Sequence, residues 1–146
     1  MSDAAARGPA ASITERDGQA LLRRFERLQL HVRCGLSPEL PGCVRLYVHA
    51  GQQIARCGLR PATEMHLRLL HTLIRTGQDE ALPWFWRSVC LEQLSLPLAS
   101  LESSMGLHDP IALQAIAAAV QRARDQLPAV PPPAQAPRPG CRGAAS

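Results

Sequence analysis

The sequence predicts an all-α protein in which antiparallel helical hairpins stack as a short tetratricopeptide-like array. Apolar residues recur at steps of three and four along most of the chain, and no segment alternates apolar and polar residues as a half-buried strand does. Stops that contain Gly or Pro separate these periodic segments, so consecutive helices should run antiparallel. The composition agrees, because 46% hydrophobic but only 3% aromatic residues suit close helix packing better than a sheet core.

Each expected helix has a recognisable start or end. Pro41, Pro61 and Pro83 can occupy first helical turns, where a missing N–H costs little. Asp109 is a good N-cap for the last helix, and Gly106 ends the helix before it. The expected helices cover residues 18–34, 41–57, 61–76, 79–94, 97–105 and 110–127.

Two helix ends share the skeleton Arg-Cys-Gly-Leu-x-Pro, which occurs in residues 31–38 and again in residues 54–61. Gly35 and Gly58 can take the left-handed conformation that closes a helix, and the Pro that follows prevents its continuation. A third stop with positive φ is expected at Gly77. The residues after it, Ala81-Leu82 and then Phe85, resemble the middle of a tetratricopeptide repeat, with a generic αα-hairpin as the alternative.

Composition divides the chain into three parts. Residues 1–11 are small and polar, and we expect a disordered N-terminus. Residues 12–127 hold all of the periodic segments and should form the helical-hairpin domain. Residues 128–146 are rich in Pro and Ala and have too few apolar side chains to bury a face, so a disordered tail is expected. A PxxP ligand for a polyproline-reading domain is the second interpretation of this tail.

The second and third helices carry more apolar surface than one packing contact needs, because in each the apolar residues span an arc of roughly 200°. Excess apolar surface on a small helical protein commonly marks a partner site, and a groove for an amphipathic helix fits it. The alternative is that both arcs are core. The residues expected to line a partner-binding groove are Met65, Leu69, Leu70, Leu73, Trp84 and Trp86.

The sequence predicts no enzyme, no metal site and no cofactor. It lacks the glycine-rich, metal-binding and nucleophile-elbow motifs of common enzymes. The five histidines are spaced so that no two share one helix turn, and His66 is expected to be a core or groove residue. Five cysteines without a CxxC pair favour buried reduced thiols over disulfides or zinc ligands.

Charge and hydropathy limit the classes of partner and the cellular location that we expect for this protein. All 16 basic residues are Arg and the net charge is +4, but these residues are scattered rather than clustered, which argues against nucleic-acid binding. No signal peptide and no apolar run long enough to span a membrane is recognised. We therefore expect a cytoplasmic protein that binds neither nucleic acid nor membrane.

Short motifs follow one another in a definite order between residues 77 and 110. A turn Gly precedes an Ala-Leu pair, a Pro-Trp-aromatic helix start, a segment with Cys and Glu, a short Leu/Ala/Glu helix and an Asp-Pro cap. The residues are Gly77, Ala81, Leu82, Pro83, Trp84, Phe85, Cys90, Glu92, Leu94, Leu96, Ala99, Leu101, Glu102, Asp109 and Pro110. This order resembles the larger needle-subunit co-chaperone of bacterial type III secretion systems, the YscG type.

The resemblance implies a tetratricopeptide-like fold and a sequestering function. In that family a concave face holds the amphipathic C-terminal helix of the needle subunit and prevents premature polymerisation in the cytosol. A small helical co-chaperone packs on the N-terminal helix, here on Leu21, Phe25 and Leu28, so a hetero-oligomer is expected. The alternative is a non-enzymatic helical adaptor or regulatory protein that binds another peptide or protein.

Overall fold

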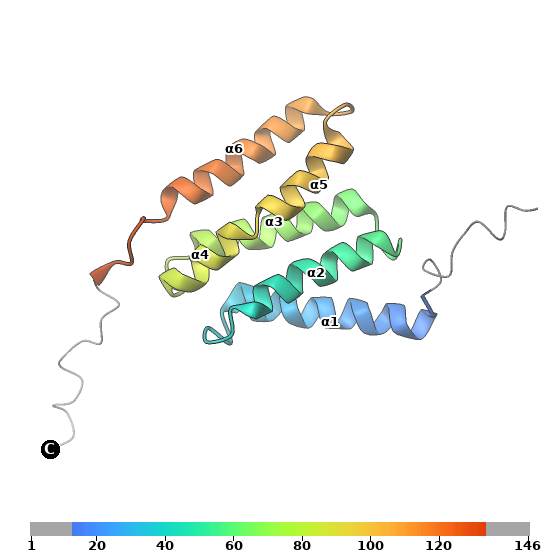
Figure 1. The fold of residues 1–146 in the computed structure, drawn as a ribbon, viewed down its shortest axis with the longest axis horizontal. Coiled ribbons are helices and arrows are strands. Elements are labelled where there is room, and N and C mark those ends of the chain that lie inside the picture. The colour runs from blue at the N-terminus through green and yellow to red at the C-terminus, as the bar shows by residue number, and fades with distance from the viewer. Residues whose placement is uncertain (1–12, 134–146) are drawn as a thin grey trace, which may run out of the picture.

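The computed structural model describes residues 13–133, and every regular element within that range is a helix (Figure 1). The predicted all-α class is therefore confirmed, and most helix bounds lie close to those expected. The helices are α1 (Glu15–Cys34), α2 (Gly42–Arg56), α3 (Ala62–Gln78), α4 (Trp84–Glu92), α5 (Ser95–Met105) and α6 (Pro110–Gln126).

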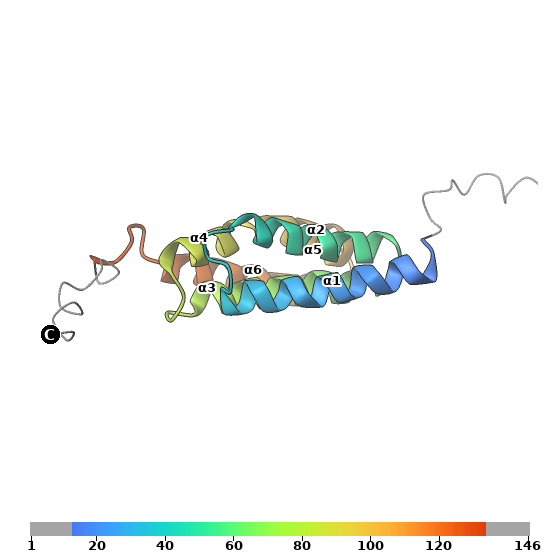
Figure 2. The ribbon, with the colours of Figure 1, turned by 90° about the horizontal axis from the view of Figure 1, so that it is seen from below.

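The helices form two layers with α3 at the centre of the molecule. Figure 2 shows α1, α3 and α6 in one layer and α2, α4 and α5 in the other. Helix α3 contacts each of the other five helices, and the core lies around it. The largest fully buried side chains come from five of the helices and from the α4–α5 junction, and they include Phe25, Tyr47, Ile54, Met65, Leu69, Leu73, Trp86, Leu94 and Leu101.

The two Arg-Cys-Gly-Leu-x-Pro segments end their helices as predicted. Gly35 and Gly58 have φ values of 57° and 70°. After each glycine, a leucine N–H reaches back five residues, from Leu36 to the His31 carbonyl and from Leu59 to the Ile54 carbonyl, both at 3.1 Å. These bonds define Schellman motifs, which satisfy carbonyls that a helix end otherwise leaves unpaired.

The prediction for Gly77 is wrong, because this residue lies inside α3 and does not have positive φ. Its role is close packing. A Cβ atom placed on Gly77 would overlap the side chain of Leu91 on α4. The missing side chain therefore lets α4 approach α3.

The fourth helix begins later than the expected residue 79. The Asp79 carboxylate accepts a hydrogen bond from the Ala81 N–H at 3.1 Å, and the Asp79 carbonyl accepts one from the Leu82 N–H at 3.0 Å. Both bonds form a turn, and Pro83 then takes an extended ψ of 141° before α4 starts at Trp84. A local side-chain bond thus competes with the helix at its predicted start.

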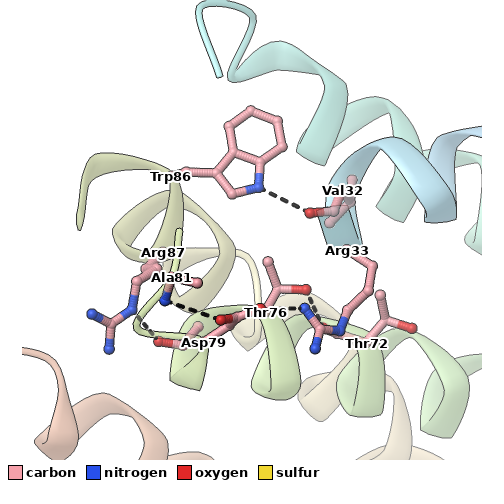
Figure 3. A network of polar contacts seen from close by, with 9 residues as sticks. Val32, Arg33, Thr72, Thr76, Asp79, Ala81, Trp86 and Arg87 are labelled. Carbon is pink, nitrogen blue, oxygen red and sulfur yellow. Dashed lines mark hydrogen bonds and ion pairs between the residues drawn. The ribbon is translucent and has the colours of Figure 1, made fainter. Parts of the chain in front are cut away.

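A small polar network ties α4 to the ends of α1 and α3 (Figure 3). The buried indole Nε1 of Trp86 donates to the Val32 carbonyl at 2.9 Å. The Nε atom of Arg87, a buried residue, donates to the Gly77 carbonyl at 2.8 Å. Arg33 pairs with Asp79 at 2.8 Å at the edge of this network.

The chain remains in contact with the domain for a short distance after α6. Leu127 packs against the core, and the Pro128 carbonyl accepts a 2.7 Å hydrogen bond from the Trp84 indole. The predicted N-terminus (1–11) and residues 134–146 of the predicted tail lie outside the described residues. Over residues 13–133, no helix combines the length and apolarity that crossing a membrane requires.

Candidate binding groove

The structure corrects the predicted groove, because five of its six residues are core residues. Met65, Leu69, Leu70, Leu73 and Trp86 are each at most 2% exposed. The reason is the central place of α3, which contacts each of the other five helices. The alternative interpretation of this arc, that it is core, therefore holds for these residues of α3, whereas Leu67 on the same helix is 38% exposed.

The remaining predicted groove residue lies at the edge of the fold. Trp84 is half-buried, and its indole donates to the Pro128 carbonyl. It therefore contacts the segment that follows α6, and the structure does not bring it to an open groove on α3.

The residues expected to receive a co-chaperone also pack inside the fold. Phe25 is buried and stacks on Tyr47, with ring centroids 4.9 Å apart. Leu21 and Leu28 are partly buried and pack against the same core. The apolar stripe of α1 therefore faces α2 and α3, and the large apolar side chain that α1 exposes is Leu30.

An open groove lies instead between α2 and the start of α5, and we call it the groove between α2 and α5. It has a volume of about 550 Å³. On α2 the lining positions recur at three- and four-residue steps, which places them on one face of the helix. The lining residues are Gly42, Arg45, Leu46, Val48, His49 and Gln52 from α2, and Gln93 and Leu96 from the other side.

The groove has an apolar floor and apolar rims. Val48 is 1% exposed and forms part of the floor, whereas Leu46 and Leu96 are 45% and 49% exposed on opposite sides. At the start of α2, a Cβ atom on Gly42 would meet nothing within 4 Å, so this end is open. Half-exposed leucines that line the same open groove are typical of a site that binds an apolar side chain.

The polar groups of the groove are basic or neutral. Arg45 and His49 are exposed and lie one helical turn apart on α2, and Gln52 and Gln93 add two amides. No Asp or Glu lines the groove. Neither the Arg45 side chain nor the His49 side chain has a hydrogen bond or ion pair among residues 13–133. The groove thus offers hydrogen-bond donors and a positive charge beside apolar surface.

The lining residues include no Ser, Thr, Cys or carboxylate that could act as a nucleophile. Elsewhere in the described part of the chain, no three His, Cys, Asp or Glu side chains gather as metal ligands would.

The cysteines and His66 occupy varied environments. Cys90 is buried, and burial raises the pKa of its thiol to about 12. Cys34 is exposed, and Cys43 and Cys57 are partly buried, so the prediction of buried thiols holds for Cys90 alone among the described cysteines. His66 lies in the core as expected, and burial lowers its pKa.

The sequence placed the expected partner-binding groove on α3, whereas the open groove of the structure borders α2. The wide apolar arc of the second helix was an equal signal, and Leu46 is the part of that arc that remains exposed. The sequence did not indicate that Leu96 is exposed, because its exposure depends on how α5 follows the break at Gln93 and Leu94.

Comparison of this chain with protein-family models, with curated proteins and with solved structures finds no match.

Proposed function

We propose that this protein is a non-enzymatic, helix-binding chaperone that holds an amphipathic helix of a partner in the groove between α2 and α5. The observation that carries the proposal is the pair of half-exposed leucines, Leu46 and Leu96, on opposite sides of an open trough. Burying them against a partner would remove apolar surface from water, which is the main driving force of such association.

The motif order between residues 77 and 110 supports a more specific partner. By resemblance to the larger needle-subunit co-chaperone, the bound helix belongs to the needle subunit of a type III secretion system. Sequestration in the cytosol would keep the needle subunit monomeric until export. The antiparallel helices lie in two layers, as helices do in a tetratricopeptide-like array, but α3 contacts more helices than a unit of a linear array does. A small helical co-chaperone would complete a hetero-oligomer.

Co-expression with a type III needle subunit tests this function. The complex is purified through a tag on the needle subunit, and polymerisation of that subunit is followed by light scattering. The chain should co-purify and suppress polymerisation. Leu46→Asp and Leu96→Asp should abolish both effects, because a carboxylate would be desolvated against the apolar face of the bound helix.

A matched control separates binding from folding. Leu67 lies on α3 and is 38% exposed, but it does not line the groove, so Leu67→Asp should leave co-purification intact. All three variants should melt close to the wild type, because each position is substantially solvent-exposed. Unchanged co-purification by the Leu46 and Leu96 variants would show that this groove is not the site.

A further inference from the structure

The groove between α2 and α5 has a charge pattern that apolar contact alone does not explain. Arg45 stands beside Leu46 on the same face of α2, and His49 lies one turn further on. No carboxylate lines the groove, and Arg45 has no ion-pair partner among the described residues. Glu39 lies shortly before α2, and Glu92 lies directly before Gln93. Neither of these glutamates lines the groove.

We infer that the helix held in this groove carries carboxylates along one edge of its apolar stripe. This inference rests on the proposed function and adds the chemistry of the partner surface. The stripe would pack between Leu46 and Leu96, and a Glu or Asp beside it would pair with the Arg45 guanidinium, whose planar donors suit a carboxylate. His49 can donate a second hydrogen bond to the same edge.

The dimensions of the groove suit a short helical segment. Its lining on α2 runs from Gly42 to Gln52, which corresponds to about 15 Å at 1.5 Å per residue. A partner helix of about three turns would match this length. Apolar positions one turn apart on that helix would meet Leu46 and Leu96, and the positions beside them would face Arg45.

Other parts of the same chain fit the charge of the groove poorly. Residues 134–146 contain Arg138 and Arg142 and no acidic residue. On the exposed face of α1, Leu30 and Glu26 lie with Arg23 and Arg27, so a second copy would bring two positive charges with its one carboxylate. A partner helix with net acidic edges is therefore the better complement.

A charge-swapped pair of peptides tests the inference on the full chain. Both probes are labelled 18-residue helical peptides with leucines at the same i, i+3, i+4 and i+7 positions, and the flanking positions are Glu in one and Lys in the other. Binding is measured by fluorescence anisotropy at low and high salt. The Glu peptide should bind about fivefold more tightly than the Lys peptide, and the difference should shrink at high salt.

Substitutions on α2 then assign the preference to one residue. Arg45→Glu should reverse the order of the two peptides. Arg56→Glu makes the same change on the same helix outside the groove, and it should leave the order intact. Equal binding of both peptides, or equal effects of the two substitutions, overturns the acidic-partner inference while leaving the proposed function in place.

Two further outcomes test more than the charge preference: one tests the proposed function, and the other tests whether a second copy of the chain occupies the groove. If neither peptide binds, or if Leu46→Asp does not weaken binding, the proposed function fails together with this inference. If sedimentation shows a dimer that Leu46→Asp dissociates, a second copy occupies the groove, and the inference of an acidic partner helix is overturned.

Discussion

The hydroxyl group of Tyr47 is buried, and no hydrogen bond within residues 13–133 compensates for its loss of contact with water. Its ring lies wholly inside the core and stacks on Phe25, and the Arg68 guanidinium lies 5.0 Å from the centre of the Phe25 ring. The Tyr47 hydroxyl is buried without a hydrogen bond of acceptable geometry among the described residues, although the Thr72 side chain lies near enough to affect it. Burial raises the pKa of Tyr47 to about 12, and Thr72 and Arg68 oppose that rise.

This burial predicts a loss of stability at alkaline pH. In the unfolded chain Tyr47 ionises near pH 10, whereas in the folded protein its pKa is about 12. Its contribution is therefore complete below pH 10 and is lost as the pH rises towards 12, at about 1.4 kcal/mol per pH unit. Cys90 adds a similar loss that starts from pH 9. Denaturant unfolding of the wild type under reducing conditions should reveal the decline.

Tyr47→Phe isolates the tyrosine contribution. At pH 8 the variant should be as stable as the wild type or slightly more stable, because it removes an unpaired buried hydroxyl. Above pH 10 its unfolding free energy should fall less steeply. An identical alkaline slope in both proteins would mean that Tyr47 reaches solvent in the folded state.

At the scale of the elements, Arg87 closes the end of α3 from a different helix. Its Nε donates to the Gly77 carbonyl in the last turn of α3, where carbonyls lack partners within the helix. A positive charge there also interacts favourably with the helix dipole. Helix α4 therefore supplies a cap that α3 lacks in its own sequence.

Replacing this cap should be costly. Arg87→Met keeps most of the apolar stem but leaves the Gly77 carbonyl unpaired, so we expect a loss of about 2 kcal/mol in unfolding free energy. Arg75→Met, at an exposed position of the same helix end, should change it by less than about 0.5 kcal/mol. Chemical denaturation of both variants makes the comparison, and equal stabilities would remove the capping role of Arg87.

The helices also show how much of the fold could be predicted from the sequence. Periodicity and stops predicted α1, α2, α3 and α6 to within a few residues, because those signals are local. Helix α1 begins at Glu15 because the Thr14 hydroxyl accepts the Asp17 N–H at 3.2 Å. Periodicity indicated which side of α3 is apolar, but it could not reveal how many neighbours cover that side. That number depends on contacts with helices distant in sequence.

For the whole molecule, the extent of the folded domain can be tested by shortening the chain. A variant that ends at Pro133 keeps Leu127 and the Pro128 carbonyl in place. A variant that ends at Gln126 loses both the packing of Leu127 and the bond from the Trp84 indole. It should be less stable by about 1–2 kcal/mol, which thermal melting would detect as a drop of several degrees relative to the Pro133 variant. Equal melting temperatures would place the end of the domain at α6.

The position of α3 has a consequence for cooperativity. In a linear repeat protein each unit touches only its neighbours, so terminal units can fray while the others persist. Here one helix contacts all five of the others, and detachment of any of them uncovers part of the same set of buried leucines. Partial unfolding therefore weakens the remainder, and the chain should cross between native and denatured states in a single step. The backbone amides of α3 would be the last to exchange with solvent deuterium.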